Sequence, residues 1–409
     1  MKKIVLLSTL TSSLIMAAAY KLPEQSLAGM ALSAANVASC EGADCAYYNS
    51  ANISFLDPNK SYIEAGLTFI HLPAIEFKGV QTLGTKQIPN EAKSKIENIA
   101  LPYFHYVSPA YNNLRYSLSI TVPGGLRKRW ESPVQKLYAQ EFDLKTISLT
   151  PSVAYKVNKN FSLSIGANIV YSEGKVKNDG RLIGIPVRRE MKGDSIDTSF
   201  NLAATWRLDN GLKIAATYKS KTKLSEEGKA NLYVGSVGKQ YDASVDIYLP
   251  ATFQLAVAKE FDRLNIEFVY ERTFWSSYKK LQFNYTPAIS NALLAAVFDE
   301  TKKKKWKDTN SFRVGLKYKY NDKITVMAGY SYDETPIDNE YVSYELPDSN
   351  GHIFSAGLQY HYSDSLSFGV AALYDYKTKR KVNSRYNGIN GEFSKGGALL
   401  ITTGFEYRF

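Results

Sequence analysis

The stretch Gly397-Ala-Leu-Leu-Ile-Thr-Thr-Gly-Phe-Glu-Tyr-Arg-Phe409 alternates between two kinds of side chain. A β-strand points successive side chains to opposite faces, so every second residue shares a face. One face of this stretch is apolar and ends in aromatic residues, whereas the other carries glycine, threonine and the Glu406–Arg408 pair. A strand of a membrane barrel, with hydrocarbon outside and water inside, has this pattern. A half-buried strand of a soluble sandwich would explain the stretch alone equally well.

The N-terminus has the order of a secretory signal peptide. Two lysines follow Met1, residues 4–16 are mostly apolar, and Ala17–Ala19 offers a small-residue cleavage site. We therefore predict a signal peptide over residues 1–19 and a mature chain that begins at Tyr20. The position after this site is not a cysteine, which argues against an acyl-anchored lipoprotein. Beyond it the sequence has no run of about 18 apolar residues, which excludes a helical membrane protein.

The composition fits an exported β-protein. The 409 residues include 30 tyrosines and 19 phenylalanines, and the formal net charge is +11. An exported chain rarely meets nucleic acid, so we expect this charge to face anionic lipid headgroups, such as those of lipopolysaccharide, or an acidic ligand. No linker or shift in composition divides the chain, which favours one large closed sheet over several soluble domains.

Alternation begins near Ser61 and continues through the rest of the chain. Connections after even-numbered strands are tight turns, as at Asn158–Asn160 and Asn321–Asp322, whereas those after odd-numbered strands are longer. Outer-membrane barrels have this asymmetry, with the short turns and both termini in the periplasm. Residues 61–409 are therefore predicted to be an all-β, fourteen-stranded antiparallel transmembrane β-barrel of the bacterial outer membrane. The predicted strands are about 61–70, 101–107, 113–122, 143–157, 161–174, 195–208, 212–225, 242–260, 264–279, 309–320, 323–333, 352–362, 365–377 and 397–409.

The two faces of these strands differ in polarity along the barrel. In the tenth strand, Phe312 and Val314 alternate with Arg313 and Gly315. The inner set is too polar for a packed core, so the lumen must contain water or a plug. Aromatic residues beside the short turns indicate a girdle at the membrane interface; they are Tyr155, Phe161, Trp206, Tyr320, Tyr360 and Tyr362.

Residues 20–60 lack this alternation and are rich in small side chains, as in Leu27–Asn36. We expect them to form an N-terminal plug inside the barrel. Cys40 and Cys45 are the two cysteines of the chain, and both lie beyond the signal peptide. An oxidising compartment and their short spacing favour a local disulfide between them. A metal site is the weaker alternative, because no histidine or second cysteine pair lies nearby.

The four histidines give no sign of catalysis. They are scattered, and none has the spacing of a metal ligand or of a catalytic group. A hydrolase embedded in a barrel would need a nucleophile and a histidine near one rim. We therefore expect no enzymatic activity, no cofactor and no metal. The histidines are His71, His105, His352 and His361.

The densest charge of the chain lies in the predicted loop before the tenth strand. Lys302–Lys305 is most simply explained as a solvated extracellular loop that touches lipopolysaccharide phosphates, and the adjacent Trp306-Lys307 could place a lysine inside the lumen. Just before it, residues 286–298 have an N-cap, a proline at the first turn and apolar residues at helical spacing. They predict a loop helix, which either packs within the loop or captures a hydrophobic molecule.

Prolines interrupt several predicted strands. Pro151 and Pro250 fall inside strands, where they indicate bulges. Pro123-Gly-Gly125 follows the regular stretch Leu114–Val122. Proline lacks an N–H group, and glycine can adopt a positive φ without a Cβ clash. The triplet therefore either ends the third strand or turns it inward and opens a gap in the wall.

Several motifs keep their order along the whole mature chain and together resemble one family. They are Leu22-Pro-Glu-Gln-Ser26, Tyr47-Tyr-Asn-Ser-Ala-Asn52, Thr150–Val157, Tyr218-Lys-Ser-Lys221, Phe274-Trp-Ser-Ser277, Trp306-Lys-Asp308, Tyr332-Asp-Glu-Thr-Pro336 and Leu346-Pro-Asp348. In these motifs the chain is similar to the long-chain fatty acid outer-membrane transporters of the FadL type, which include aromatic-hydrocarbon transporters. The family's usual Asn-Pro-Ala-Asn reads Asn49-Ser-Ala-Asn52 here.

This resemblance implies a monomeric barrel with a plugged lumen, a substrate pocket above the plug and a lateral exit at a kink of the third strand. The kink corresponds to Pro123, Gly124 and Gly125. The family's lysine before the tenth strand corresponds to Lys307, beside Trp306. Its arginine after the fifth strand has no exact match, and Lys175 and Arg181 are nearby. These four residues are the predicted substrate-binding candidates.

The predicted function is the passive uptake of long-chain fatty acids or other hydrophobic compounds, with lateral release into the membrane. A general diffusion porin is the alternative, but it would need an open lumen. A barrel enzyme would need the histidine arrangement described above, and an adhesive role of the loops stays open. The sequence does not distinguish a fatty acid, an alkane and an aromatic substrate, although the basic loops favour a carboxylate.

Overall fold

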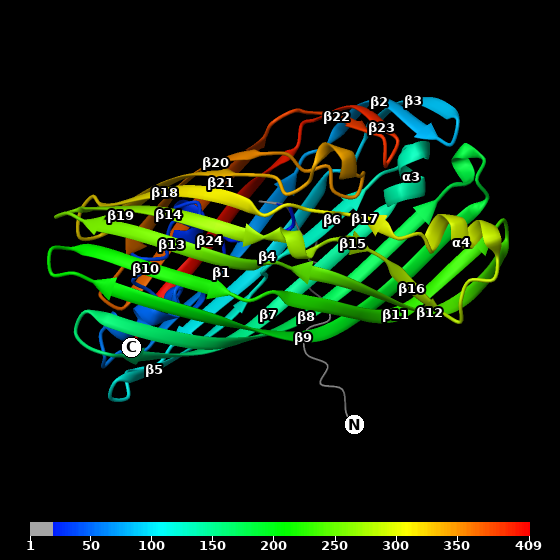
Figure 1. The fold of residues 1–409 in the computed structure, drawn as a ribbon. Coiled ribbons are helices and arrows are strands. Elements are labelled where there is room, and N and C mark those ends of the chain that lie inside the picture. Colours follow the sequence, from blue (N-terminus) through cyan, green and yellow to red (C-terminus); the bar gives the residue numbers. More distant parts are fainter. Residues whose placement is uncertain (1–18) are drawn as a thin grey trace.

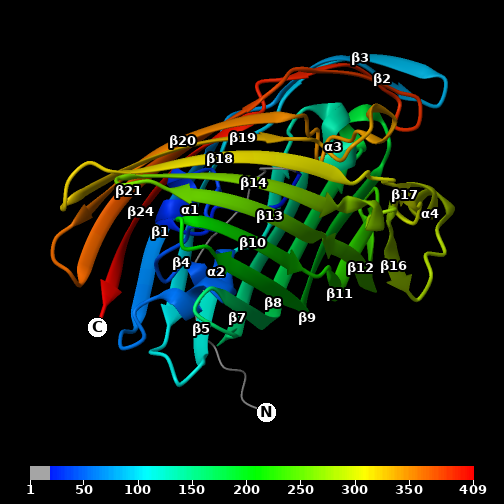
Figure 2. The same cartoon turned by 60° about the vertical axis from the view of Figure 1, so that its left-hand side comes forward.

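The computed structural model describes residues 19–409, and its strands form one closed antiparallel ring (Figures 1 and 2). The wall has 14 strand positions, some of them filled by two consecutive segments. β24 closes the ring on β1, with Tyr62 opposite Arg408 and His71 opposite Leu399. The predicted fourteen-stranded barrel is confirmed, whereas the predicted signal peptide lies outside the described residues apart from Ala19.

In chain order the wall consists of β1 (Tyr62–Leu72), β4 (Glu97–Val107), β5 (Leu114–Thr121) with β6 (Gly125–Arg129), β7 (Glu141–Lys156), β8 (Phe161–Asp179), β9 (Val187–Arg207), β10 (Leu212–Lys219) with β11 (Thr222–Val234), β12 (Val237–Leu249) with β13 (Ala251–Glu260), β14 (Leu264–Phe274) with β16 (Phe283–Thr286), β18 (Thr309–Lys319), β19 (Ile324–Asp333), β20 (Gly351–His361), β21 (Leu366–Lys377) and β24 (Gly397–Arg408).

The two faces of the wall follow the alternation of the sequence. In β24, Leu399 and Ile401 are 40% and 45% exposed, whereas the intervening Leu400 and Thr402 are buried. Large apolar side chains point outward in the same way on most wall strands. This outer surface is stable only where hydrocarbon covers it, as expected for a membrane barrel.

The extracellular loops form structure that the sequence did not predict. Two loops far apart in the chain share a four-stranded sheet at the end of the barrel opposite the C-terminus (Figure 2). β2 pairs with both β3 and β23, which joins residues on the two sides of the ring closure. The sheet consists of β2 (Glu76–Leu83), β3 (Lys86–Lys93), β22 (Arg380–Ser384) and β23 (Ile389–Ser394).

Short elements complete the loops. The predicted loop helix is present, but it begins later than expected, because β16 extends to Thr286 and the Asn291 side chain accepts the Leu294 N–H as the N-cap. Within the described residues no helix is long and apolar enough to cross a membrane. The loop elements are α3 (Pro133–Ala139), η2 (Arg181–Ile183), η3 (Trp275–Ser277), β15 (Lys280–Leu281), α4 (Ala292–Phe298), β17 (Lys302–Lys303) and η4 (Asn339–Tyr341).

The N-terminal segment, residues 19–60, lies inside the ring at the end where the C-terminus lies (Figure 2). Its elements are α1 (Leu27–Ala31), α2 (Cys45–Tyr48) and η1 (Ser50–Phe55). It is hydrogen-bonded to strands on several sides of the wall, for example from the Leu27 N–H to Glu64 of β1 and from the Asn49 side chain to Thr205 of β9. These contacts fix the segment in the lumen.

Glycines in the wall let α1 and the turn that follows it approach the strands. A Cβ at Gly329 would lie 2.2 Å from the carbonyl carbon of Leu32, and one at Gly369 would lie 2.1 Å from the Leu27 side chain. No real Cβ contact is that short, so a larger residue would push the N-terminal segment away from the wall.

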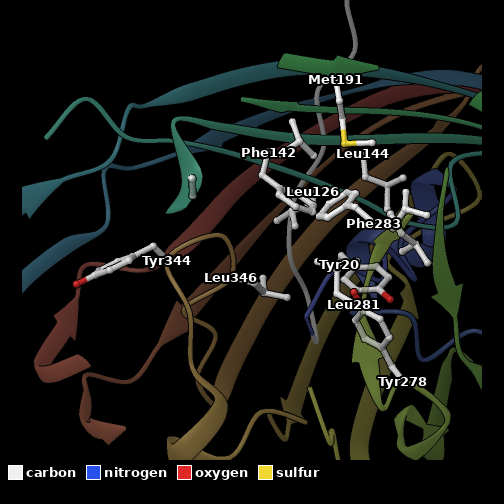
Figure 3. Packing of buried hydrophobic residues seen from close by; sticks show 14 of the residues in the cluster. Tyr20, Leu126, Phe142, Leu144, Met191, Tyr278, Leu281, Phe283, Tyr344 and Leu346 are labelled. Atoms are coloured by element: carbon white, nitrogen blue, oxygen red, sulfur yellow. The ribbon is translucent and has the colours of Figure 1, made fainter. Parts of the chain in front are cut away.

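Part of the lumen beyond the N-terminal segment is apolar. Side chains from β6, β7, β9, β16 and the loops meet there in one buried cluster (Figure 3). It includes Leu126, Phe142, Leu144, Met191, Leu281, Phe283 and Leu346. The lumen therefore has a hydrophobic region between the loops and the N-terminal segment.

Candidate functional site

The third wall strand is broken between β5 and β6. Both segments pair with β7, but β5 pairs with β4 only from Phe104–Ile120 to Val107–Ser117. β4 itself continues along β1 as far as Glu97. Within residues 19–409, residues 97–103 of β4 are therefore not paired with a strand on the side that faces β5. At the far end, the Lys95 N–H donates to the Arg129 carbonyl at 2.8 Å.

The N-terminal segment holds the backbone of this break. The Leu22 N–H donates to the Pro123 carbonyl at 3.1 Å, and the Gly125 N–H donates to the Tyr20 carbonyl at 2.8 Å. The Gln25 side-chain amide bonds both the N–H and the carbonyl of Val122, each at 2.8 Å. Unpaired backbone groups facing hydrocarbon would cost several kcal/mol each, so these bonds stabilise an inward turn of the strand.

The break lies at Pro123-Gly-Gly125, where the sequence predicted an irregularity. Neither glycine has a positive φ. Gly124 is required for close approach instead, because a Cβ there would lie 2.6 Å from the Tyr20 carbonyl oxygen. A side chain at this position would separate the strand from the N-terminal segment.

A cavity of about 910 Å³, including the solvent at its mouth, lies between the N-terminal segment and the inner wall. It touches the wall at Pro123, at Ser220 between β10 and β11, and at Pro250 between β12 and β13. Its lining is amphipathic: Tyr47, Val170 and Leu249 are among its apolar members, and its polar members include Ser148, Thr150, Asn168, Ser199, Asn201, Lys219 and Gln254.

Ionised side chains form a network at one side of the cavity. Lys21 of the N-terminal segment forms an ion pair with Glu271 of β14. Arg313 of β18 lies 3.4 Å from Glu271 and 3.3 Å from Asp333 of β19. These ion pairs connect Lys21 of the N-terminal segment with three wall strands, and the buried Glu24 of the same segment also interacts with Arg313.

Lys219 lines the same cavity as Lys21 and Glu271. Its ammonium lies 3.4 Å from the centre of the Tyr47 ring. Its charge interacts with those of Glu271 and Lys21, although it forms no ion pair with a carboxylate among residues 19–409. Sequence reasoning did not single out Lys219 as a cavity residue, although it lies within the quoted Tyr218–Lys221 motif. The available signal was its inward parity in β10.

Aromatic rings of the loops pack against Tyr20 of the N-terminal segment. The Tyr20 and Trp275 rings are 5.0 Å apart, Trp275 and Trp306 are also 5.0 Å apart, and Tyr278 lies 4.8 Å from Trp306. The predicted candidate Trp306 is thus buried in an aromatic cluster that includes Tyr20. Its position is compatible with contact to a hydrophobic substrate.

The structure does not bring the predicted basic candidates together. Lys307 is 59% exposed and lies 3.4 Å from Asp338, so the expectation of a buried ammonium is wrong. The Trp306 side chain points into the lumen instead, and the Lys307 side chain points away from it. Arg181 bonds Asp179 at 2.7 Å, and Lys175 bonds Glu141 at 2.9 Å. Lys307, Arg181 and Lys175 are not among the described residues that line the cavity.

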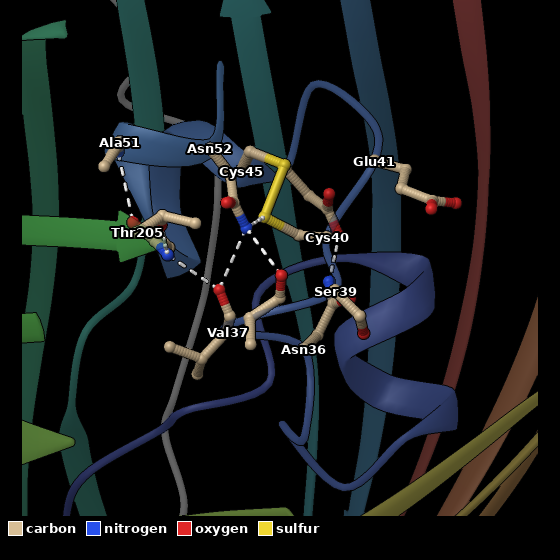
Figure 4. The surroundings of a disulfide bond; sticks show 12 residues. Asn36, Val37, Ser39, Cys40, Glu41, Cys45, Ala51, Asn52 and Thr205 are labelled. Carbon is tan, nitrogen blue, oxygen red and sulfur yellow. Dashed lines mark hydrogen bonds between the residues drawn. A yellow bond between two sulfur atoms is a disulfide. The ribbon is translucent and has the colours of Figure 1, made fainter. Parts of the chain in front are cut away.

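Cys40 and Cys45 are joined by a disulfide in the N-terminal segment, with Cα atoms 5.4 Å apart (Figure 4). The Asn52 side-chain amide donates to the Val37 and Ala38 carbonyls, both at 3.1 Å. The loop between α1 and α2 is therefore held by a covalent bond and by hydrogen bonds. That this disulfide forms in the cell stays a prediction.

A carboxylate of the wall also binds this loop. Glu267 of β14 accepts the backbone N–H groups of Val37, Ala38 and Ser39 at 2.6, 2.8 and 3.0 Å. Sequence reasoning gave no role to Glu267.

In residues 19–409 no group of three or more His, Cys, Asp or Glu side chains could hold a metal ion.

Comparison with known proteins extends these observations. Residues 8–409 match the family described as outer membrane protein transport protein (OMPP1/FadL/TodX). A long-chain fatty acid transport protein of Escherichia coli O6:H1 is 25% identical over 405 residues, which cover 88% of this chain and 87% of that protein. Outer membrane protein P1 of Haemophilus influenzae is 22% identical over 343 residues, 74% of this chain and 71% of that protein.

Solved structures show the same fold. A Pseudomonas aeruginosa FadL homologue aligns with a TM-score of 0.79 at 21% identity, covering 96% of this chain and 99% of that one. The Pseudomonas putida toluene transporter TodX aligns with a TM-score of 0.71 at 16% identity, with coverage of 96% and 99%. The members of this family are outer-membrane transport proteins rather than enzymes. This chain, matched over almost its whole length, belongs to the OMPP1/FadL/TodX family of outer-membrane transport proteins.

Proposed function

We propose that this protein carries long-chain fatty acids or other hydrophobic compounds passively from outside the cell into the outer membrane, and releases them sideways through the break in the third strand. The observation that carries the proposal is the position of the cavity, which touches Pro123 at the place where β5 leaves β4. A hydrophobic molecule that leaves there enters hydrocarbon without crossing periplasmic water.

The proposed path begins in the apolar lumen between the loops and the N-terminal segment. It passes the aromatic cluster around Trp306 and reaches the cavity beside Pro123. The relatives named for long-chain fatty acid and toluene transport support a hydrophobic substrate. The proposed steps need no covalent chemistry and no cofactor, because the substrate only moves from one non-covalent site to the next.

The N-terminal segment argues against the alternative, a general diffusion porin. It fills the lumen at the periplasmic end, where Met30, Leu32 and Ile53 are fully buried. We propose that residues 20–60 act as a plug. The purified protein in planar bilayers should then show far lower conductance than an open porin of similar size, and porin-like conductance would support the alternative.

We further propose that the protein acts as a monomer and that its loops contact lipopolysaccharide. The lysines of Lys302–Lys305 offer less free positive charge to lipopolysaccharide than the sequence alone suggests. Lys304 is buried and paired with Glu345; although burial opposes ionisation, this ammonium holds the pKa of Glu345 below its usual range. Lys303 and Lys305 lie near tyrosine rings instead. Analytical ultracentrifugation with and without lipopolysaccharide tests both points.

Straightening the third strand tests lateral release. The triple variant Pro123→Thr, Gly124→Val, Gly125→Thr supplies the missing donor and side chains of a regular strand, and removes the close approach at Gly124. Uptake of a radiolabelled fatty acid by cells should fall sharply, whereas heat-modifiable gel mobility should still report a folded barrel. Pro89→Thr, in the extracellular sheet, is the control. Transport by the triple variant at the parent rate would place the exit elsewhere.

A further inference from the structure

We infer that Glu226 binds the hydroxyl group of a hydrophobic substrate, so that the apolar part of the lumen favours an alcohol over an alkane of the same length. This inference rests on the proposed function and deepens it, because the site lies on the proposed path between the loops and the break. The site is separate from the cavity beside Pro123, since the described linings of the two cavities share no residue.

A second cavity, of about 340 Å³ including the solvent at its mouth, lies in the apolar part of the lumen. Phe142, Met191 and Phe283 of its lining belong to the apolar cluster of Figure 3. Glu226 of β11 also lines this cavity and is 3% exposed. It lies directly opposite Val245 of β12, which in turn lies opposite Phe283 of β16. A carboxyl group therefore faces a space whose other walls are mostly hydrocarbon.

The carboxyl group of Glu226 keeps a free acceptor oxygen. Its Oε1 atom is buried and accepts no hydrogen bond from residues 19–409. Ser172 lies beside the carboxyl group, but the single hydroxyl proton of Ser172 is used elsewhere. Ser195 donates to Asp197 at 2.6 Å, so the 2.9 Å bond between Ser172 and Ser195 has Ser172 as its donor. A buried acceptor without a partner costs free energy, and a ligand that donates a hydrogen bond would remove this cost.

The charged neighbours of Glu226 do not compensate it. The charges that affect it most are those of Asp194, Glu173 and Asp197, all of them carboxylates. Lys192 is on the same part of β9, but it is paired with Glu173 at 2.8 Å. Among residues 19–409 Glu226 itself forms no ion pair. An anionic headgroup would therefore be repelled from this site.

Two other charged side chains of this region are engaged. Arg189 is buried and donates to the Asn178 side chain at 2.9 Å and to the Tyr285 hydroxyl at 3.0 Å. Asp143, which also lines the cavity, is paired with Arg127 at 2.8 Å. The carboxyl group of Glu226 is thus the unpaired one at this cavity within the described chain.

A row of glycines makes room for this carboxyl group. Gly174 of β8 pairs with Gly193 of β9, which pairs with Gly228 of β11. A Cβ at Gly174 would lie 1.9 Å from Oε2 of Glu226, closer than real Cβ contacts allow. The wall therefore has a recess where the carboxyl group lies at the edge of the cavity.

A hydroxyl group fits this site better than an ammonium group does. An ammonium has three N–H donors, and the apolar walls would leave those that do not reach Glu226 unpaired. A hydroxyl has one donor, which Oε1 accepts. The attached hydrocarbon would then lie against apolar lining residues such as Val176 and Ile247.

The test uses the full-length mature protein in detergent, with 1-dodecanol, dodecane and dodecylamine as probes in equilibrium dialysis. Each variant is compared with the parent in the same detergent, so partitioning into micelles cancels. Glu226→Met should weaken dodecanol binding about tenfold, the loss expected for one hydrogen bond to a buried carboxyl group, and should leave dodecane binding within about twofold. Glu226→Gln keeps an acceptor oxygen and should keep dodecanol binding. Glu227→Met is the matched control, because Glu227 is the adjacent exposed residue.

The outcomes are distinct. Unchanged dodecanol binding by Glu226→Met overturns the inference, and so does an equal loss of dodecanol and dodecane, which would indicate a structural role. Tighter binding of dodecylamine than of dodecanol by the parent would assign the site to a cation and overturns it too. If Glu226→Met does not give a heat-modifiable barrel, the parent decides: tighter binding of dodecanol than of its methyl ether, which cannot donate, supports the inference, and equal binding overturns it. A parent that binds none of the probes contradicts the proposed function itself.

Discussion

The hydrogen bonds of Gln25 provide a direct test of how the break is stabilised. Its side-chain amide satisfies the N–H and the carbonyl of Val122, each at 2.8 Å, and the residue is buried. Gln25→Ala leaves both backbone groups buried and unpaired. Each lost partner costs about 1–3 kcal/mol, so the local contact should be weakened by about 2–6 kcal/mol.

Hydrogen–deuterium exchange measures this change, because local opening governs the exchange of protected amides. The Val122 amide and the amides of Leu22 and Gly125 should exchange faster by on the order of 30-fold to 10,000-fold, since about 1.4 kcal/mol corresponds to a factor of ten. The rest of the barrel should keep its protection and its heat-modifiable mobility. Gln25→Glu should give a smaller effect, because the carboxylate accepts from Val122 but cannot donate.

Gln87→Ala, on the exposed face of the extracellular sheet, is the matched control and should leave these amides unchanged. If Gln25→Ala leaves the exchange of Val122 unaltered, the N-terminal segment does not hold the break, and the backbone there must be stabilised by the wall alone.

Three further predictions follow from the geometry of the lumen. Gly329→Leu should displace the N-terminal segment, because its Cβ would lie 2.2 Å from the backbone of Leu32; limited proteolysis should then cut residues 19–60, and continued protection would contradict this account. Lys307→Ala should leave oleate binding unchanged, since that side chain is 59% exposed; a tenfold loss would return the headgroup site to this lysine. Non-reducing peptide mapping should find Cys40 linked to Cys45, and two free thiols would refute the pairing.

The wall of the barrel could be predicted because its signals are local. Alternation along Gly397–Arg408 fixes which side chains face outward, and short turns such as Asn321–Asp322 fix which strands are neighbours. Both depend on residues close in sequence, so the number of strands and the position of the third-strand break followed from the chain alone. The pairing of Cys40 with Cys45 is local in the same sense.

What only the tertiary structure decided involves residues that are distant in sequence. Lys21 meets Glu271 and Gly124 meets Tyr20 because the closed ring surrounds the N-terminal segment. The extracellular sheet forms for the same reason, since ring closure brings the loops on either side of β1 together. Which of two adjacent residues, Trp306 or Lys307, enters the lumen depends on the space that Tyr20 and Trp275 leave there. A one-residue shift in an irregular loop reverses the side-chain direction, and no local pattern fixes it. The same holds for Glu226: its inward parity can be read from the strand, but its lack of a cation partner depends on every element that faces the cavity.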